Sequence, residues 1–201
     1  MTRSIVFGLF AAFIAFSPAT AQNGPATDPV EFVRTLGDDT IDVMRTTDTK
    51  VRRERFQVVL DQGFAVDTIA RFVIGRYWRA ANDEQRREYM RLFRNFVLLT
   101  YAARLDGYAG QTFKLTGSVR IDDKDTLVKT IIRQPDKPPI RADYRVRKTN
   151  DGLKIIDVMV EGVSLVTTQR SEFASIINRD GIDGLLERLR GYGKKPITQN
   201  N

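Results

Sequence analysis

The stretch Ile140–Val166, read as IRADYRVRK, TNDG, LKIIDVMV and EGVSLV, carries the clearest structural pattern of the chain. From Ile140 to Arg147, apolar or small residues alternate strictly with charged residues. This alternation is typical of a strand with one buried and one solvent-facing side. Asn150–Gly152 supplies residues that tolerate a positive φ, so we expect the next run to fold back as an antiparallel hairpin.

The second strand of this hairpin, Leu153–Val160, is apolar on both sides. Simple alternation gives two apolar sets: Leu153, Ile155 and Met159 on one face, and Ile156, Val158 and Val160 on the other. A strand of this kind is expected to be covered on both faces. One face can take a layer of helices. The covering of the other face is the question that bears on function.

Helical periodicity dominates the first half of the chain. We expect helices from Asp28 to about Thr47, over Lys50–Gln62, from a cap at Asp67 to Trp78, and from Asn82 to about Leu105. The last of these begins with a capping box, because Gln85 follows Asn82 by three residues. Aromatic residues recur along this helix at helical spacing. Such a stripe more often packs in the hydrophobic core than lines a ligand site.

Strands are expected to follow over Thr112–Ile121 and Thr126–Arg133. The first should place four apolar residues on one face: Phe113, Leu115, Val119 and Ile121. Gln134–Pro139 contains three prolines and is expected to be a loop.

After the hairpin, Ser164 is placed to cap a helix that breaks at Asn178–Gly181, and a last helix is expected over Ile182–Arg190. Four antiparallel strands flanked by helices predict an α+β fold with helices on one face of a curved sheet.

The N-terminus has the pattern of a signal peptide. An apolar run, Ile5–Phe16, follows Arg3 and precedes the small residues Ala19–Ala21. We expect cleavage after Ala21 and a single domain over 22–201 with an ordered core of about 28–190. The mature chain would be exported to the periplasm.

The composition limits the classes of binding partner that the protein is expected to have. The net charge is +7, or +6 without the signal peptide, and the chain has no Cys. An exported protein without disulfides suits the bacterial periplasm. The basic balance could favour anionic lipid, acidic proteins or nucleic acid. Export argues against nucleic acid as the partner. Because the basic residues are dispersed along the chain, the simplest interpretation is that they form an ordinary solvent-exposed surface.

Most catalytic chemistry has no residues to carry it. The chain has no His and no Cys, and it contains no nucleophile elbow, Walker loop or dinucleotide fingerprint. We therefore expect no metal, no cofactor and no catalytic residue. Asp157 and Glu161 stand in apolar runs and are the candidates for carboxylate chemistry. The simpler interpretation is that each pairs with an arginine or caps backbone groups.

Several segments together resemble a known family. They are GRYWRAANDEQRREY (Gly75–Tyr89), TYAARL (Thr100–Leu105) and VEGVSLV (Val160–Val166), followed by RSEFASII and GIDGL. In this order they closely resemble the MlaC, or toluene-tolerance, family of periplasmic phospholipid-binding proteins. The resemblance covers about Asp28 to Leu189.

The resemblance implies an NTF2-like fold, in which a curved antiparallel sheet and helices enclose a deep apolar cavity. It also implies that the cavity holds the two acyl chains of a phospholipid. The implied partners are an inner-membrane ABC transporter complex with an MCE-domain protein and an outer-membrane lipoprotein–porin complex. We expect a monomer without enzymatic activity. A branch of the family associated with hopanoid biosynthesis leaves a polycyclic lipid open as the alternative ligand.

We expect the apolar residues of the long helix and of the inner sheet face to bind lipid. The candidates are Phe93, Phe96, Val97, Tyr101, Tyr108, Val128, Ile132, Ile140, Tyr144, Val146, Ile156, Val158, Val160 and Val163. Val163 follows a glycine where the strand ends, so a charge there should exclude lipid from a folded protein. Two other functions stay open: an enzyme that uses Asp157, and an interaction module whose apolar strands are only core.

Overall fold

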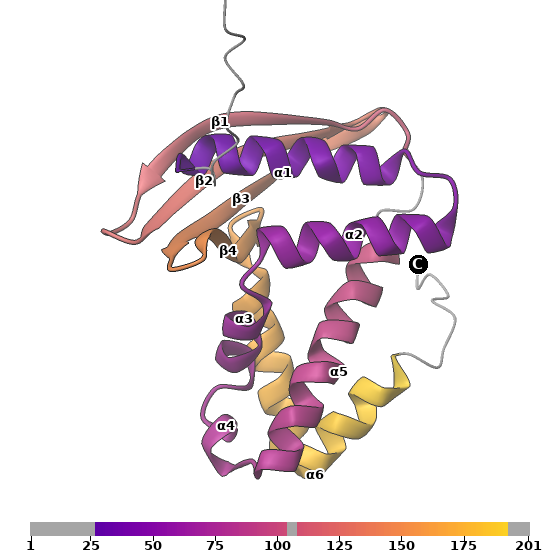
Figure 1. Cartoon of the computed structure of the whole chain (residues 1–201), viewed down its shortest axis with the longest axis vertical. Helices are drawn as coiled ribbons and strands as arrows, with labels where there is room; N and C mark the ends of the chain where they lie inside the picture. The colour runs from indigo at the N-terminus through magenta and orange to yellow at the C-terminus, as the bar shows by residue number, and fades with distance from the viewer. Residues whose placement is uncertain (1–26, 104–107, 193–201) are drawn as a thin grey trace, which may run out of the picture.

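Five antiparallel strands, neighbours in space in their order along the chain, form the sheet (Figure 1). They are β1 (Thr112–Arg120), β2 (Asp125–Gln134), β3 (Lys137–Thr149), β4 (Gly152–Val160) and β5 (Val163–Ser164). The computed structural model describes residues 27–103 and 108–192. The expected signal peptide, the cleavage site after Ala21 and the end of the long helix at Leu105 lie outside these residues.

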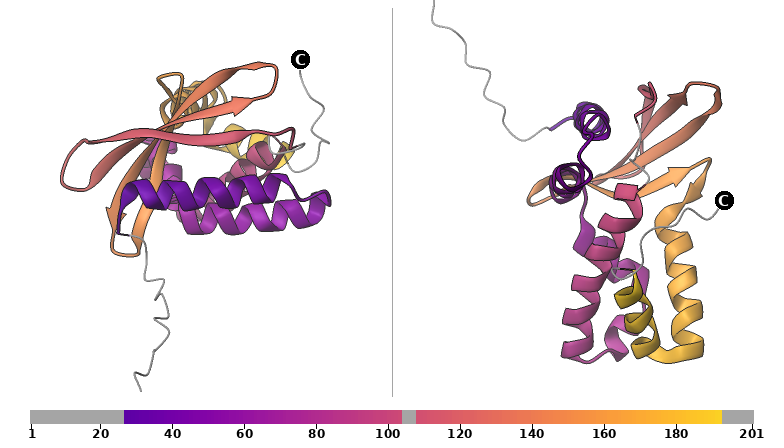
Figure 2. Two further views of the ribbon diagram at one scale, coloured as in Figure 1. Left: turned by 90° about the horizontal axis from the view of Figure 1, so that it is seen from above. Right: turned by 90° about the vertical axis from the view of Figure 1, so that its right-hand side faces the viewer.

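The helices form two groups. They are α1 (Pro29–Met44), α2 (Thr49–Gly63), α3 (Val66–Ile74), α4 (Tyr77–Ala80), α5 (Asp83–Ala102) and α6 (Leu165–Gly191). Helices α1 and α2 lie side by side along one face of the sheet, whereas α3, α5 and α6 extend away from it (Figures 1 and 2). The α+β class is confirmed. In the described part of the chain, no helix is long and apolar enough to cross a membrane.

The β3–β4 hairpin has the predicted position. Thr149 pairs with Gly152 across a two-residue loop, and Gly152 has a φ of 96°, which glycine adopts without steric cost. The Thr149 hydroxyl donates to the Gly152 carbonyl at 2.7 Å. The short strand β5 was not expected and adds an edge beyond β4.

A bulge in β4 corrects the prediction of two apolar faces. The register passes from the pair Arg145–Asp157 directly to Val146–Ile155, which leaves Ile156 without a partner. An extra residue of this kind reverses the alternation beyond it. Ile155 therefore faces the same side as Val158, and that side is the one toward the helices.

A second bulge corrects the face predicted for β1. The register shifts between Leu115 and Gly117. Phe113 and Leu115 pack against the core beneath α1 and α2, but Val119 and Ile121 are exposed. The four residues therefore do not share one buried face.

The proline-rich segment is mostly strand, so the predicted loop over Gln134–Pro139 was wrong. Gln134 pairs with Lys137, which leaves a two-residue turn, and β3 begins at Lys137. The turn residue Asp136 has a φ of 58°. Pro138 and Pro139 have no register partner and are exposed, so their missing N–H groups remove no ladder hydrogen bond.

The third helix also differs from the prediction. Ala65 is its N-cap residue and makes no side-chain cap, whereas Asp67 lies in the first turn and pairs with Arg94 at 3.0 Å. The helix ends at Ile74 because Gly75 has a φ of 58°. Tyr77 and Trp78 consequently belong to the separate short helix α4.

Other helix boundaries follow the sequence signals. The capping box of Asn82 and Gln85 is present in both directions, and the Ser164 side chain accepts from the Thr167 N–H. The predicted break in the last helical region is a kink at Gly181, with φ 71° and ψ −179°.

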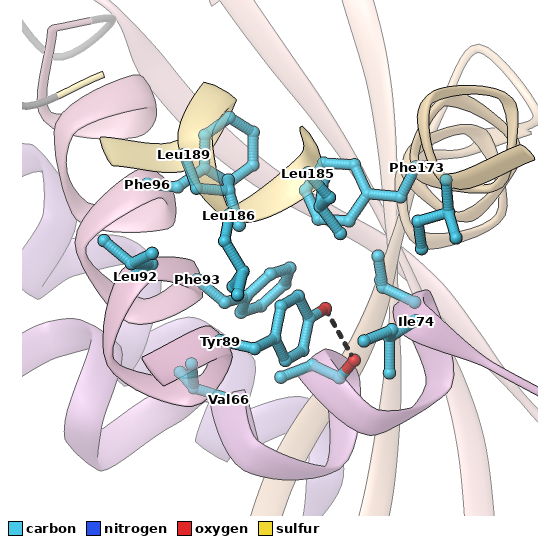
Figure 3. Close-up of a cluster of buried hydrophobic side chains, with 13 residues drawn as sticks. Val66, Ile74, Tyr89, Leu92, Phe93, Phe96, Phe173, Leu185, Leu186 and Leu189 are labelled. Atoms are coloured by element: carbon cyan, nitrogen blue, oxygen red, sulfur yellow. Dashed lines mark hydrogen bonds between the residues drawn. The ribbon is translucent and has the colours of Figure 1, made fainter. Parts of the chain in front are cut away.

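Helices α3, α5 and α6 share a hydrophobic core that contains several aromatic rings (Figure 3). Phe93 of α5 and Phe173 of α6 meet edge to face, with 6.2 Å between ring centroids. The Tyr89 hydroxyl donates to the Ala70 carbonyl at 2.8 Å, and burial raises the pKa of Tyr89 far above its usual value. A second core lies between α1, α2 and the sheet, around Val128 and Val146.

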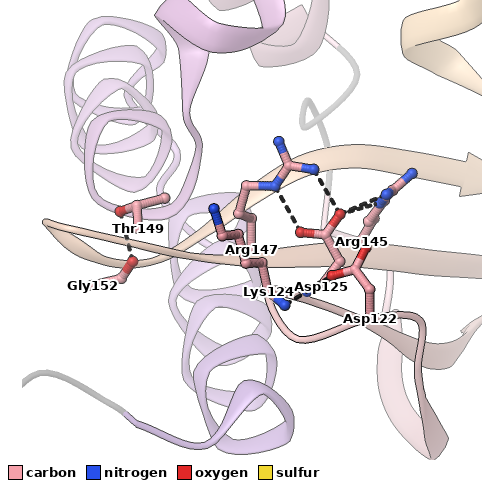
Figure 4. A network of polar contacts seen from close by, with 7 residues as sticks. All are labelled: Asp122, Lys124, Asp125, Arg145, Arg147, Thr149 and Gly152. Atoms are coloured by element: carbon pink, nitrogen blue, oxygen red, sulfur yellow. Dashed lines mark hydrogen bonds and ion pairs between the residues drawn. The ribbon is translucent and has the colours of Figure 1, made fainter.

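The sheet face away from α1 and α2 carries a buried ion-pair network (Figure 4). The side chain of Asp125 has no exposed surface. Its oxygens accept from Arg145 Nε at 2.7 Å and from Arg147 Nε at 2.7 Å. The hydrogen bonds from Arg147, followed by those from Arg145, lower the pKa of this carboxyl despite its burial. The network ties β2 to β3.

Candidate ligand cavity

A cavity of about 630 Å³ lies where the two hydrophobic cores meet. Its wall takes residues from α1, α2, α3 and α5, from β1 to β4 and from the start of α6. Phe64 and Val97 pack against both cores and also line the cavity. The cavity therefore lies where the two groups of helices separate from each other.

The inner sheet face forms one wall. Tyr144 pairs with Val158, and Ala142 pairs with Val160. All of these residues line the cavity, together with Ile155. Ile155 reaches the wall only because of the bulge at Ile156.

The helices form the remaining walls. Apolar residues at helical spacing face the space from each of them: Val33, Leu36, Ile41 and Met44 of α1; Phe56, Val59 and Leu60 of α2; Val66, Ile69 and Val73 of α3; Phe93, Phe96 and Val97 of α5. A space with such walls accepts apolar groups and offers little to a polar ligand.

The charged and amide side chains that the described residues contribute to the wall lie in two regions. One lies around the β2–β3 turn, where Gln111, Gln134 and Lys137 line the cavity and Lys137 is exposed. The other is the start of α6, with Asp157 and Gln169. The first region reaches the protein surface, because Lys137 is exposed there.

The Asp157 carboxylate has a structural role. It accepts from the Ser164 hydroxyl at 2.6 Å and from the Val166 N–H at 3.3 Å, and thereby ties the end of β4 to the first turn of α6. Glu161 lies in the exposed β4–β5 turn and accepts from the Arg141 N–H at 2.6 Å. Both carboxylates thus serve local backbone groups.

Tyr144 is the ionisable ring on the inner sheet wall. Its ring meets Phe113 at a centroid distance of 6.1 Å. Burial raises its pKa to about 12, because the charged phenolate would be poorly solvated there. The phenol therefore stays neutral over the physiological range.

The structure brings eight of the fourteen candidate residues to the cavity wall. They are Phe93, Phe96, Val97, Tyr101, Ile132, Tyr144, Val158 and Val160. They come from α5 and from the inner faces of β2, β3 and β4. Helical periodicity and strand alternation put these eight residues on faces that line the cavity, and their contact with lipid stays a prediction.

The other six candidates lie outside the wall, for four different reasons. Val128 and Val146 face the correct side but are fully buried in the core beneath α1 and α2. Ile140 faces the same side near the start of β3, beside Ile132, without reaching the cavity. Ile156 is the bulged residue of β4.

Two of the six are on the surface. Val163 belongs to the edge strand β5 and is 58% exposed, so the charge test proposed for it addresses the wrong side chain. Tyr108 is exposed, and the Arg45 guanidinium lies 5.1 Å from its ring centroid. Its neighbour Ala109 lines the cavity instead.

No ligand role was predicted for the residues of α1, α2 and α3. Their apolar stripes were recognised as helix faces, but periodicity alone does not distinguish a face that packs from a face that lines a space.

A smaller pocket of about 210 Å³ between α2 and α5 is lined by Arg91, Arg94 and Asp61 among others. The described residues hold no group of three or more His, Cys, Asp or Glu that could bind a metal ion.

Comparisons with known proteins agree on one family. The model of the family described as MlaC protein matches residues 34–191. A curated relative, the intermembrane phospholipid transport system binding protein MlaC of Haemophilus influenzae, is 26% identical over 132 residues, which are 64% of this chain and 62% of the relative. The match thus spans less than two thirds of that relative's length.

A solved structure shows the same architecture. The phospholipid-binding protein of Ralstonia solanacearum, determined in complex with a phospholipid, superposes with a TM-score of 0.71 at 26% identity. The superposition covers 83% of this chain and 97% of that one. Because the family model spans most of the sequence, from the second turn of α1 to the end of α6, the chain belongs to the MlaC family.

Proposed function

We propose that this protein is a carrier that shields the acyl chains of a phospholipid in the cavity between its two cores. The observation that carries the proposal is an apolar cavity of about 630 Å³, within the range of about 300–1,000 Å³ typical of small-molecule sites. The family membership and the phospholipid bound to the Ralstonia protein support it.

The energetics suit a carrier. Two acyl chains contain roughly 30 methylene groups, and their transfer from water is worth about 24 kcal/mol at about 0.8 kcal/mol each. That exceeds the ceiling of about 18–21 kcal/mol for noncovalent affinity, so free lipid in water is the wrong reference state. Transfer from an apolar bilayer to an apolar cavity is nearly balanced, and a carrier can therefore both load and unload.

The cavity wall suggests how the ligand lies. The acyl chains would contact the ring of Phe93 and the inner sheet wall at Tyr144 and Val158. The polar head group would remain near Gln134 and Lys137, where the wall reaches the surface. A head group buried deeper would lose hydration without finding partners.

We further propose that the mature protein works in the periplasm and shuttles lipid between membranes. The partners would be an inner-membrane ABC transporter complex with an MCE-domain protein and an outer-membrane lipoprotein–porin complex. The predicted signal peptide Met1–Ala21 supports export. The transport-system name of the Haemophilus relative supports the intermembrane role.

A catalytic role is not part of the proposal. The Asp157 carboxylate lines the cavity but is engaged by Ser164 and the Val166 N–H, which is the structural alternative considered from the sequence. A polycyclic hopanoid would also be apolar and remains the second candidate ligand.

Organic extraction of the protein purified from its native cell envelope tests the proposal. We expect a diacyl phospholipid in about equimolar amount. A hopanoid would replace the phospholipid in the proposal. An extract without any lipid, from a protein that melts cooperatively, would contradict the carrier function.

A further inference from the structure

The exposed side of α3 and α4 concentrates arginine and aromatic residues. From Thr68 to Asn82 the chain contains three arginines and no carboxylate. Arg170 of α6 adds a fourth, because its Nη1 atom donates to the Phe72 carbonyl at 3.3 Å. We call Arg71, Phe72, Arg76, Tyr77, Trp78, Arg79 and Arg170 the arginine–aromatic surface. In Figure 1 its helices α3 and α4 lie on the left, and α3 is in contact with α6.

The described part of the chain offers the arginines of this surface no acidic partner. Arg71, Arg76, Arg79 and Arg170 are all exposed. Within residues 27–103 and 108–192, none of them forms an ion pair with a carboxylate. The acidic residues at either end of the segment are already engaged: Asp67 pairs with Arg94, and Asp83 pairs with Arg86.

Instead, three of the four guanidinium groups, those of Arg71, Arg76 and Arg170, stack on aromatic rings. Arg170 Cζ lies 4.7 Å from the Phe72 ring centroid, and Arg71 Cζ lies 5.4 Å from that of Trp78. Stacking covers the flat face of a guanidinium and leaves N–H groups at its edge for a ligand. Those edges fit the oxygens of a phosphate diester in a bidentate manner. The surface is therefore preorganised for phosphate groups.

We propose that the arginine–aromatic surface docks the protein on the anionic head groups of a phospholipid bilayer. An acidic protein would satisfy the arginines, but it gives no reason for a phenylalanine that is 47% exposed among them. Aromatic side chains next to basic ones are typical of proteins that rest at the interface of a bilayer.

The position of the surface relative to the cavity supports the same partner. Val73, the neighbour of Phe72, lines the cavity, and so does Gln169, the neighbour of Arg170. Docking through this surface would bring the α3–α6 wall of the cavity close to the lipid. This proposal goes beyond the identity of the cargo, because head-group docking and acyl-chain burial involve different residues.

Flotation with lipid vesicles tests the proposal. Protein expressed from its full-length sequence is mixed with vesicles of phosphatidylcholine, or of equal parts phosphatidylglycerol and phosphatidylcholine. We expect binding only to the anionic vesicles and weaker binding as salt rises, since the Debye length falls. Each arginine near an anionic surface contributes about a fivefold gain in partitioning. The double variant Arg71→Gln/Arg170→Gln should therefore bind about 25-fold more weakly.

A matched variant separates this surface from net charge. Arg53 of α2 and Arg133 of β2 are exposed and lie outside the arginine–aromatic surface. Arg53→Gln/Arg133→Gln makes the same change in charge and should bind almost as well as the wild type. Equal losses in the two double variants, or no binding of the wild type to anionic vesicles, would overturn the proposal. Extracted lipid should be unchanged in all variants, so a failure here is distinct from a failure of the carrier function.

Discussion

A charge on the inner sheet wall should empty the cavity without unfolding the protein. Val158 lines the cavity beside Tyr144, its cross-strand partner on β3, and is only partly buried. In Val158→Asp, none of the described wall residues beside the new carboxylate is cationic. It would cost several kcal/mol if it stayed dry, so we expect it to draw in water. The fold survives because the space it faces is not filled by side chains.

The effect on lipid follows from the methylene groups that the hydrated carboxylate displaces. If about four methylenes lose their contact with the wall, at about 0.8 kcal/mol each, binding weakens by about 3 kcal/mol. This is roughly a hundredfold in affinity. Val158→Trp should give a similar loss by filling the space with apolar volume, and it carries no penalty for a buried charge.

The assay compares thermal melting and extracted phospholipid on the same samples. Val163 is the matched control. It is also a valine, but it lies just after the β4–β5 turn and is 58% exposed. Val163→Asp and Val163→Trp should melt like the wild type and retain lipid. Normal melting with wild-type lipid in both Val158 variants would refute the assignment of this wall. Failure of both Val158 variants to fold would show that the face is solid core.

Three further predictions concern stability. Asp125→Asn should lower the free energy of unfolding by about 1–2 kcal/mol, because the two partner arginines are partly exposed. Since the folded pKa of Asp125 is lowered, this stabilisation is present above the unfolded value of about 3.9 and is lost as pH falls through the folded pKa. Urea unfolding of both proteins at neutral and acidic pH should show the difference shrinking; a constant difference would remove the ion-pair explanation. The raised pKa of Tyr144, about 12, predicts stability that falls as pH rises above the unfolded value of about 10. Tyr144→Phe should reduce that fall, as monitored by unfolding at alkaline pH, and an unchanged fall would contradict it. Gly181→Ala should cost about 1–2 kcal/mol because of the φ of 71°, and a thermal melt equal to that of the wild type would argue against the kink.

Local signals in the sequence predicted much of the fold. Strict alternation from Ile140 to Arg147 identified β3, and the caps at Asn82 and Ser164 marked the starts of α5 and α6. These features depend on residues close together in the chain. The bulge at Ile156 could not be predicted in the same way, because it is defined by pairing with β3 and leaves the composition of β4 unchanged.

The cavity could be predicted only in part. The stripe of α5 and the inner strand faces led to residues such as Phe93 and Tyr144, which do line it. Val128 carries the same signal but is core, because α1 and α2 cover that part of the sheet. Whether an apolar face packs or lines a space depends on how far the helix groups are apart, and no short pattern encodes that distance.

The central claim is that acyl chains occupy the space between the two cores. Loading the protein with a phospholipid that carries a photoactivatable group in an acyl chain, and mapping the adducts by peptide mass spectrometry, tests this directly. We predict adducts on the wall, at residues such as Phe93, Tyr144 and Val158. Adducts confined to exposed residues such as Val119 and Val163, or an absence of adducts on a loaded protein, would contradict the claim.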